Sequence, residues 1–475
     1  MLYLESRAQQ VAQEDLVMFI NACFSCSGQR EFYDDAYGQK VSINFLHDYI
    51  LGNYRLLYAR TLAAGINHFN QAQIIIKLLA NGRDTLPHYR TEESALITSA
   101  LNQLPPQRGW GVLQELQQLR VNNRRARAIV RDYIAMRRDM DFDAIKYRTK
   151  VKAAISHAHL KLSGELPKFL FNFHEQKAFS TKLFEQFRKA HYSTEAVYEL
   201  PFTIAEGFAA KHNIKREVFL KRIQPKMTAA EKLRYQGAAS RSEVDINVNW
   251  ERLPLTKLAL YILSLPLEAR TKDFDKFNQA MEAAASHALK KAPMQLGRVA
   301  AVLDCSYSSS GSSEKRRRPL GVVLAAHYLL RAASQSYRAF WTVTPKHPLL
   351  VYPCGQTDLA TPLLAALGSG AETIIIISDG CDNDPPNGTA EVLRVYQKLD
   401  RCHKTSIIHC NPVFSNEDYS LRTLSPYIPT VGLRDAEDMP TMLGFAKFAQ
   451  GSTTLSDLEA YLAQRTQEFT SNTHN

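Results

Sequence analysis

The sequence contains few cysteines and no long apolar run. Its seven cysteines are scattered over 475 residues, too few for the disulfide framework that supports small secreted domains. The longest apolar runs, around Ile74–Ile76 and Ile374–Ile377, fall far short of the ~20 residues that span a membrane. The first ten residues carry early charges and no apolar signal segment. We therefore expect a reduced, cytoplasmic protein.

The sequence also lacks the common catalytic motifs. It contains no GxxxxGK[ST] phosphate loop and no HExxH zinc helix, and no histidine and nucleophile stand at a recognisable spacing. Cys23 and Cys26 form a CxxC without a second ligand pair at zinc-site spacing, so we interpret them as small apolar residues on a helix. We expect no enzymatic activity; a metal-dependent hydrolase is the least favoured hypothesis.

The positive charge is distributed unevenly. The chain has 58 Lys and Arg against 47 Asp and Glu, a net charge of +11. From Arg298 onward there are 16 basic and 17 acidic residues, which leaves 42 basic and 30 acidic residues before it. The excess of +12 therefore lies in the first three-fifths of the chain. Such a distribution predicts a module that binds a polyanion, joined to a neutral module.

The first part of the chain has the pattern of many short helices. Good helix formers dominate residues 6–292, and breaks recur at Gly82-Arg83-Asp84, Leu104-Pro105-Pro106 and Gln224-Pro225. About a dozen helices without strand alternation predict a HEAT-like α-solenoid over residues 1–292. An irregular helical bundle is the alternative. The sequence leaves open whether a solenoid closes into a ring.

One predicted helix of this part carries an arginine stripe. Residues 120–161 contain twelve basic and four acidic residues. On a helix from Arg124 to Arg138, the arginines 124, 127, 131 and 138 fall on one face, and Ile129, Tyr133 and Met136 fall on the opposite face. Asp132 and Asp139 lie to the side of the stripe. The planar fork of arginine suits phosphate groups, although a solvated helix face has the same pattern.

A second basic stretch runs from Lys211 to Lys232, with Phe219 interleaved. Because nothing in either stretch reads bases, we expect recognition of RNA shape and backbone rather than of sequence. The candidate RNA-binding residues are Arg124, Arg127, Arg131, Arg138, Lys146, Lys150, Lys215, Arg216, Lys221 and Arg222.

Residues 293–475 change to an alternation of strands and helices. This alternation predicts a mostly parallel, doubly wound sheet covered by helices on both faces, so the protein combines an α module with an α/β domain. Ligands of such sheets bind at the carboxyl ends of the strands. The predicted strands are Val299–Leu303, Ala339–Val343, Leu349–Tyr352, Thr373–Ile377 and Ser406–His409.

Oxygen-bearing side chains follow three of these strands: Asp304, Ser306 and Ser308, then Thr357, then Asp379. Two carboxylates and three hydroxyls on one sheet edge form a hard-oxygen site suited to Mg²⁺. The pattern DxSxS…T…DG over residues 298–465 resembles the metal-ion-dependent adhesion site of von Willebrand factor A domains. That resemblance implies that Ser306 and Ser308 ligate the metal directly. It implies the same for Thr357 in one state, and for the two aspartates directly or through water.

Four consecutive cations, Lys315 to Arg318, follow the serine loop. We weigh two interpretations: they neutralise a phosphate or an acidic partner near the metal site, or they form a solvated loop.

A basic helical module followed by an A domain with this metal motif resembles the Ro/TROVE family. The segment Trp250–Thr256, which leads into a helix before the A domain, adds to the likeness. The resemblance implies a non-catalytic RNA-binding protein that takes small structured non-coding RNA and the ends of misfolded RNA. The alternative is an A-domain adaptor that holds an acidic protein partner through its Mg²⁺ site without RNA.

Overall fold

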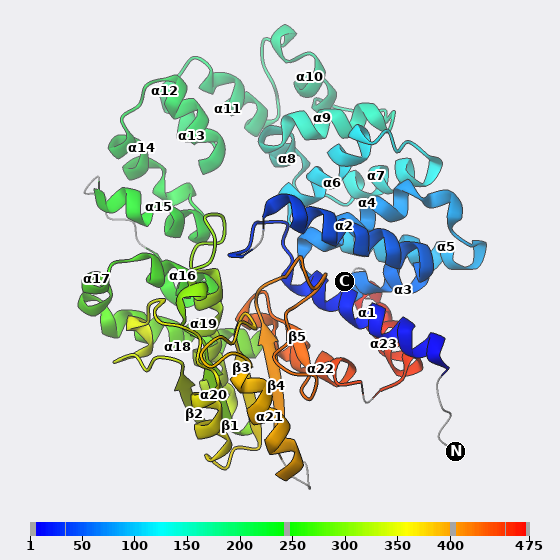
Figure 1. The fold of residues 1–475 in the computed structure, drawn as a ribbon. Helices are drawn as coiled ribbons and strands as arrows, with labels where there is room; N and C mark the ends of the chain where they lie inside the picture. Colours follow the sequence, from blue (N-terminus) through cyan, green and yellow to red (C-terminus); the bar gives the residue numbers. More distant parts are fainter. Residues whose placement is uncertain (1–5, 34, 242–247, 400–404, 452, 472–475) are drawn as a thin grey trace. The chain divides into compact units, whose positions relative to one another are not determined.

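The computed structural model describes residues 6–33, 35–241, 248–399, 405–451 and 453–471 (Figure 1). The chain divides into two compact units. Unit 1 combines Met1–Gln71 with Trp250–Glu468, and unit 2 comprises Ala72–Asn249 with Phe469–Asn475. The predicted boundary at residues 292 and 293 marks the change from helical to mixed sequence. The compact units divide the chain at other positions, because the first 71 residues belong to the same unit as the sheet.

The described residues before the sheet form helices joined by short turns, as the composition predicted. In unit 1 the helices are α1 (Arg7–Ser25), α2 (Ala36–Asn53), α3 (Arg55–Arg60), α16 (Leu255–Ser264), α17 (Leu267–Lys272) and α18 (Phe274–Lys291). Helix α4 (His68–Ala80) leads into unit 2. Unit 2 contains α5 (Arg90–Gln103), α6 (Pro106–Gln118), α7 (Arg124–Ala135), α8 (Met140–Lys146), α9 (Arg148–His157), α10 (Leu166–Phe171), α11 (Lys182–Ala190), α12 (Thr194–Val197), α13 (Phe202–Lys211), α14 (Arg216–Ile223) and α15 (Ala229–Arg241).

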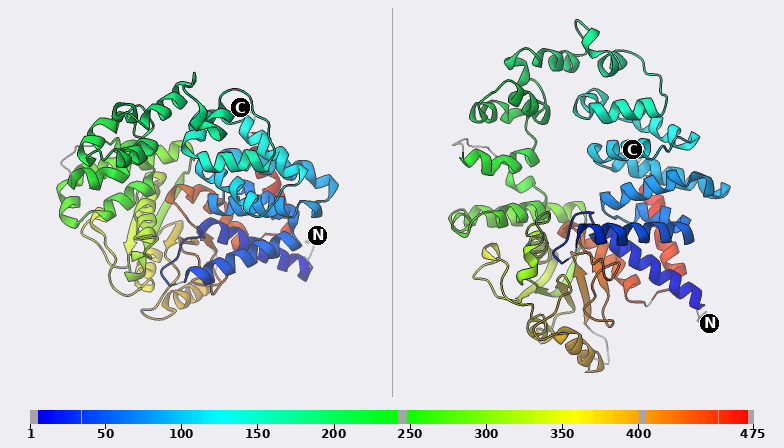
Figure 2. Two further views of the ribbon diagram at one scale, coloured as in Figure 1. Left: turned by 90° about the horizontal axis from the view of Figure 1, so that it is seen from above. Right: turned by 45° about the horizontal axis from the view of Figure 1, so that its top comes forward.

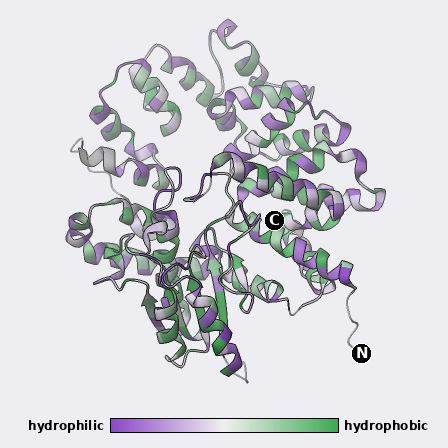
Figure 3. Ribbon diagram, viewed as in Figure 1, coloured by the Kyte–Doolittle hydropathy of each residue, from purple (hydrophilic) through white to green (hydrophobic). Residues whose placement is uncertain are grey.

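Helices of unit 2 that are near one another in the chain pack together. Helix α5 contacts α7, α6 contacts α9, and α13 contacts both α12 and α14, and Figure 2 shows these helices side by side in chain order. Hydrophilic and hydrophobic residues alternate along them (Figure 3), so each helix buries one face and exposes the other. Around α13 and α14 the buried face includes Phe202, Phe219 and Leu220. This packing of helix on helix is what a solenoid requires.

Unit 1 contains a five-stranded parallel sheet with the order β2-β1-β3-β4-β5. The predicted architecture, a helical part followed by a parallel α/β sheet, is confirmed. The strands are β1 (Leu296–Leu303), β2 (Ser334–Trp341), β3 (Thr373–Ile377), β4 (Ser406–Asn411) and β5 (Thr430–Gly432). The later helices are α19 (Arg318–Ala333), α20 (Ala360–Leu367), α21 (Gly388–Leu399), α22 (Met439–Ala449) and α23 (Leu455–Ser471).

Both faces of the sheet are buried, as parallel strands require. On one face Ile374 and Ile376 pack against Leu363 of α20 and Leu393 of α21. Helix α19 contacts β1 and β2, and it also contacts α16 and α18. Because α19 lies between the sheet and these helices, its residues are buried without interruption from Pro319 to Leu330.

The N-terminal helix α1 belongs to the sheet domain. It contacts β5, where Asn21 Nδ2 donates to the carbonyl of Thr430 at 3.1 Å and Gly432 N donates to Asn21 Oδ1 at 3.2 Å. Ser25 Oγ donates to the carbonyl of Asn411 at 3.1 Å. The amphipathic helix α1, which also contacts α2, therefore covers the edge of the sheet. The sequence alone did not predict this pairing.

Two strand predictions need correction. The segment Leu349–Tyr352 is not a strand: Pro348–Leu350 forms a 3-10 turn, and Arg270 donates to the carbonyl oxygens of Leu349 and Val351. Its apolar residues are buried by this loop packing rather than by sheet pairing. The predicted strand Ala339–Val343 begins earlier, at Ser334, and ends at Trp341. The short strand β5 was not predicted. Among the described residues no helix is long and apolar enough to cross a membrane.

Candidate metal centre and arginine-rich groove

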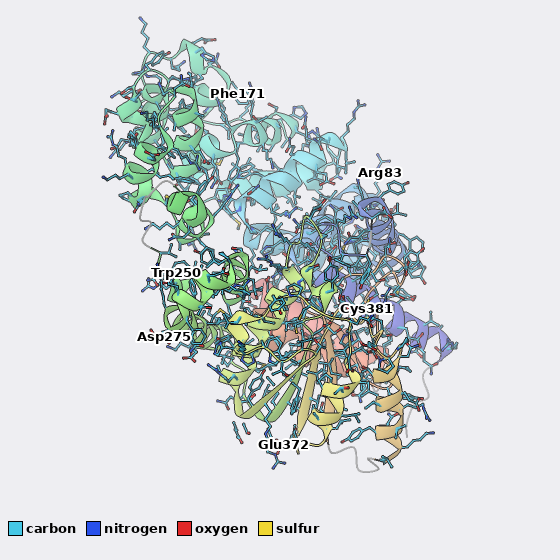
Figure 4. All side chains as sticks on the ribbon, turned by 60° about the vertical axis from the view of Figure 1, so that its left-hand side comes forward. Arg83, Phe171, Trp250, Asp275, Glu372 and Cys381 are labelled. Atoms are coloured by element: carbon cyan, nitrogen blue, oxygen red, sulfur yellow. The ribbon has the colours of Figure 1, made fainter. Side chains whose placement is uncertain are left out.

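Two of the predicted ligand loops leave adjacent strands at the centre of the sheet. Asp304 follows β1, and Asp379 follows β3. The chain turns to opposite sides of the sheet after these strands, because β1 lies between β2 and β3. Such a switch point is where parallel α/β sheets place their ligands. Figure 4 labels Cys381 just after β3 and Glu372 just before it, at opposite ends of the strand.

Four of the five predicted ligands lie in one buried cluster. Ser306 N donates to Asp304 Oδ1 at 2.8 Å, and the hydroxyl oxygens of Ser306 and Ser308 lie 3.2 Å apart. The Ser308 side chain lowers the pKa of the Asp379 carboxyl group, and Ser378 Oγ donates to Asp304 Oδ2 at 3.0 Å. All four ligand side chains are buried. The serine loop and the aspartate after β3 therefore meet as the motif predicted.

Thr357 is held on a third loop attached to the other two. The amide of Tyr307 donates to the carbonyl of Gly355 at 3.1 Å, which joins this loop to the serine loop. On the other side, Thr357 N donates to Asn383 Oδ1 at 2.9 Å, and the amide of Asp384 donates to the Thr357 carbonyl. Thr357 is buried. Its loop therefore lies at the same sheet edge, although its predicted preceding strand is absent.

Burial disfavours the charged forms of the two carboxyl groups of this cluster, Asp304 and Asp379. It raises the pKa of Asp304 well above the usual range, and the neighbouring carboxylate of Asp379 raises that pKa further. Burial also raises the pKa of Asp379, against the lowering effect of the Ser308 side chain. Two buried like charges are costly without a counter-charge between them. A divalent cation supplies such a counter-charge.

The donor chemistry fits Mg²⁺. Two carboxylates and three hydroxyls offer only hard oxygen ligands, and in the described part of the chain no three His, Cys, Asp or Glu side chains gather in a set suited to softer metals. Asp358 and Asp382 lie near the site in sequence, but the described atoms give them structural roles: Asp382 Oδ2 accepts from Thr389 N at 2.6 Å, and Asp358 Oδ1 accepts from Thr361 N.

A segment of the N-terminal region, Arg30–Tyr33, lies against the serine loop; we call it the N-terminal strap. Ser312 Oγ donates to the carbonyl of Arg30 at 2.6 Å, and the Arg30 amide donates to Glu314 Oε2. The rings of Phe32 and Tyr307 meet edge to face with centroids 6.1 Å apart. Sequence reasoning missed the strap, because nothing in its residues points to a contact some 280 positions away.

The last residue of the strap reaches the metal-site cluster. The side chains of Ser308 and Cys381 both influence the pKa of the Tyr33 hydroxyl. Arg422 Nη1 donates to the sulfur of the same Cys381 at 2.7 Å. Burial raises the pKa of Tyr33 to about 12, so its hydroxyl remains protonated near neutral pH.

The four cations after the serine loop are mostly used within the protein, which excludes the interpretation of a wholly solvated loop. Lys315 forms a buried ion pair with Glu31 of the strap. Arg317 donates to the carbonyl of Leu263. Arg318 donates to Asp435 Oδ1 at 2.6 Å. Only Arg316 is exposed. Gly311 permits this loop, since its φ is +68° and an added Cβ would lie 2.1 Å from the Lys315 carbonyl.

Unit 2 contains a groove lined by arginines. It has a volume of about 1160 Å³. One wall consists of the turn after α4 and the start of α5, and the other wall consists of the turn after α6 and the start of α7. No carboxylate of a described residue lines it. Its polar lining residues are Arg83, Arg90, Ser94, Arg120, Asn122, Asn123, Arg124 and Arg125.

Most of the positive charge in this groove is uncompensated. Arg83, Arg120 and Arg124 are exposed, and no ion pair to a described residue involves them. Arg90 donates only to the carbonyl of Thr85, at 3.4 Å. Arg125 is paired with buried Glu93 at 2.6 Å, but its Nη2 has no hydrogen-bond partner among the described residues. Figure 4 labels Arg83 at the surface.

The predicted arginine stripe is shorter than expected. Helix α7 ends at Ala135, so Arg138 lies outside the helix, and Met136 is exposed rather than part of the core face. Ile129 and Tyr133 are buried as predicted. Arg131 pairs with Asp132 at 2.9 Å, although that aspartate was expected to leave the stripe unneutralised. Arg124 and Arg127 remain exposed.

The other predicted RNA-binding residues are partly paired with carboxylates. Arg216 pairs with Glu206 at 3.0 Å and Arg222 with Glu195 at 2.5 Å, while Lys215 and Lys221 are exposed. Lys146 lies over the rings of Phe142 and Tyr147, with its Nζ 5.3 and 5.7 Å from their centroids. Lys150 is half-buried.

Sequence reasoning missed Arg83, Arg90 and Arg120 as members of one site. One sequence feature could have pointed to this site: Arg83 and Arg120 both stand just after the end of a helix, and Arg83 directly follows Gly82.

The fold belongs to the class in which a helical part accompanies a parallel α/β sheet with oxygen-bearing loops at its carboxyl edge. The chain is similar to the solved structure titled the Deinococcus radiodurans Ro (RSR) protein, with 13% sequence identity and a TM-score of 0.45 over 93% of this chain and 100% of that one. No protein-family model matches the chain. No curated protein matches it either.

Proposed function

We propose that this protein is a non-catalytic RNA-binding protein of Ro type that takes small structured RNA and RNA ends. The observation that carries the proposal is the arginine groove of unit 2, in which four arginines face no carboxylate. Guanidinium groups bind phosphate through paired hydrogen bonds. The motif-level resemblance of the sequence to the Ro/TROVE family supports the same ligand.

The groove favours the RNA backbone over the bases. Among the described residues that line it there is no aromatic side chain on which a base could stack, and its apolar members are aliphatic: Ala80, Leu119, Val121 and Ala128. Proteins that bind single strands through their bases use aromatic platforms. We therefore expect contacts to phosphates, with little dependence on nucleotide sequence.

Charge reversal in the groove tests this function. The triple variant R83E/R120E/R124E should weaken the binding of a labelled structured RNA at least about tenfold, measured by fluorescence anisotropy at fixed salt. The control K168E/K177E/K182E makes the same charge change at exposed lysines of unit 2 that lie outside the groove. Equal affinity of the groove variant and the unchanged protein would contradict the assignment. No RNA binding by the unchanged protein would contradict the function itself.

A second candidate function is favoured by the cluster of Asp304, Ser306, Ser308 and Asp379. With Thr357, these residues would hold Mg²⁺, and a bound Mg²⁺ would supply a position for the carboxylate of an acidic partner. The chain would then act as an A-domain adaptor. A protein partner recovered from the native cell only with Mg²⁺, and lost with Asp304→Ala, would support this function. Recovery that is independent of Mg²⁺ would exclude it.

A further inference from the structure

The outer edge of strand β4 is paired over only half of its length. Strand β5 pairs with the second half of β4, residues His409–Asn411. Among the described residues no strand pairs with the outer edge of the first half, Ser406–Ile408. A cavity of about 670 Å³ lies along this unpaired half. Open strand edges are places where a further extended chain can add to a sheet.

The backbone of Ile407 faces this open edge. The N–H and C=O groups of successive residues in a strand alternate between its two neighbours. Ser406 N donates to the carbonyl of Glu372 on the β3 side, and His409 N donates to the carbonyl of Pro429 on the β5 side, both at 2.9 Å. Ile407 therefore directs its N–H and C=O away from β3. No described residue hydrogen-bonds either of these two groups.

A proline explains why the pairing of β4 with its neighbour stops here. Continuing the parallel ladder by one step would require an N–H at position 429 to donate to the Ile407 carbonyl. Position 429 is proline, which has no N–H. The Ile407 N–H would in turn need the carbonyl of Tyr427, but Tyr427 lines the cavity instead. The sequence therefore ends the ladder at Pro429 and leaves one backbone donor and one acceptor beside a cavity.

The cavity has apolar walls from the two helices that flank this edge. Leu393 and Tyr396 of α21 line it together with Leu443 of α22. Ile407 packs in one cluster with Leu393 and Tyr396, so its side chain faces α21, and the alternation of the strand turns Ile408 to the other face. An added strand would therefore meet apolar side chains on both of its faces, as a buried parallel strand does.

We propose that this cavity binds a short extended peptide with consecutive apolar residues, which continues the ladder beyond β5 and exchanges hydrogen bonds with the N–H and C=O of Ile407. In this mode of recognition the main-chain bonds give affinity and the side-chain pockets give specificity. The cavity volume is that of a pocket for a small ligand, so a segment of a few residues fills it. Every lining residue belongs to unit 1, so the proposal does not depend on RNA binding by the groove of unit 2.

The test follows the backbone amide of Ile407. We would label the full chain with ¹⁵N-isoleucine, identify the Ile407 signal by its loss in Ile407→Val, and measure hydrogen exchange by NMR. In the free protein this amide should exchange at least about tenfold faster than that of Ile408, which faces β3. The probes are blocked tetrapeptides Ac-Ser-X-X-Ser-NH₂, in which each X is Val, Ile, Leu or Phe.

At least one of these peptides, at millimolar concentration, should slow the exchange of the Ile407 amide about tenfold. Its analogue with both central amides methylated should not bind, because a methylated amide cannot donate to the Ile407 carbonyl. Leu443→Trp places an indole ring in the cavity and should weaken binding at least about tenfold. The matched control Gly444→Trp places the same ring on the next residue of α22, which does not line the cavity and has open space around an added Cβ. This control should bind within about twofold of the unchanged chain.

Three results would overturn the inference. The first is an Ile407 amide that exchanges as slowly in the free protein as the amide of Ile408. The second is that none of the peptides slows its exchange. The third is equal binding by the methylated analogue, or by a folded Leu443→Trp variant. Because the methylated analogue is tested on the unchanged chain, the inference stays falsifiable if Leu443→Trp fails to fold.

Discussion

Glu31 and Lys315 form an ion pair that is almost wholly buried, with 3% and 7% of their side chains exposed. The pair joins the N-terminal strap to the loop that follows the serine ligands. A charge at this depth is tolerated only beside its partner. Burial also keeps bulk water and salt from screening the pair, which distinguishes it from the ion pairs at the surface.

Removing one member of this pair should destabilise unit 1. We expect Glu31→Gln alone to lower the free energy of unfolding by about 3–5 kcal/mol, because the ammonium group of Lys315 then stays buried without its carboxylate. The double variant E31Q/K315M should recover much of that loss. Chemical unfolding followed by circular dichroism measures both.

The matched control is the exposed pair of Arg298 and Glu372, with 63% and 55% of the side chains exposed. Arg298→Ala should change the stability by less than about 1 kcal/mol. A cost for Glu31→Gln no larger than that of the control would contradict the structural role of the buried pair.

The contact between α1 and β5 can be tested with a glycine. A Cβ added at Gly432 would lie 2.7 Å from the Asn21 carbonyl and 2.7 Å from Ser25 Oγ. Because backbone atoms cannot move aside easily, Gly432→Ala should cost about 1–3 kcal/mol in thermal or chemical unfolding. Gly444 lies in α22 with no atom within 4 Å of an added Cβ, so Gly444→Ala should stabilise slightly. Equal effects of the two substitutions would argue against docking of α1 on the sheet.

The salt dependence of RNA binding should report the groove. Each phosphate neutralised by a cation contributes about 0.7 to the slope of log affinity against log salt for a single strand. Replacing Arg83, Arg120 and Arg124 with glutamine should therefore reduce the magnitude of that slope by up to about 2. Titrations of one RNA at several salt concentrations give the value. An unchanged slope with weaker binding would mean that these arginines act without contacting phosphate.

Acid should destabilise the protein partly through His327. Burial lowers the pKa of His327 to about 3, and its Nδ1 lies 3.0 Å from the hydroxyl of Tyr337. The unfolded chain takes up a proton near pH 6.5 and the folded chain does not, so the stability that the neutral ring contributes is present above pH 6.5. It is lost as the pH falls from 6.5 toward 3, by about 1.4 kcal/mol per pH unit.

The comparison of His327→Phe with the unchanged protein isolates this contribution. Urea unfolding at several pH values between 6.5 and 4 should show a shallower loss of stability in the variant, whatever its stability at pH 7. The same substitution at the exposed His287 should leave the slope as it is. Parallel slopes for His327→Phe and the unchanged protein would show that the ring is protonated in the folded state.

The sequence predicted the parts of the molecule that depend on local pattern. The run from Thr373 to Ile377 is strand β3, and the DxSxS and DG segments meet because carboxyl ends of parallel strands share one edge. The strand predicted at Leu349 failed, because a short apolar run is buried equally well in a loop held by Arg270. Strand β5 has three residues, too few to show the alternating pattern by which a strand is predicted.

The sites that depend on distant contacts were not predictable. The N-terminal strap has no local signal, since Arg30 meets Ser312 and Glu314 only in the folded chain. Arg83, Arg90 and Arg120 stand on separate turns, and only helix packing gathers them in one groove. Conversely, the stripe on α7 failed at Arg138, because the helix ends three residues earlier. The ion pair of Arg131 with Asp132 was not predicted either, because it depends on the side-chain conformations of the two residues.

The docking of α1 on the sheet has a consequence for biosynthesis. Gln13 hydrogen-bonds Thr453, 440 positions later, and Asn21 hydrogen-bonds Thr430. The ribosome therefore releases α1 long before Phe445 has been synthesised. In the folded chain the ring of Phe445 packs against the ring of Phe24 of α1, with centroids 5.6 Å apart. Nascent chains expose unpaired apolar surface for as long as such partners are missing. Unit 1 is therefore complete only when nearly the last helix has been made, and until then this apolar face of α1 lacks its partners on the sheet side.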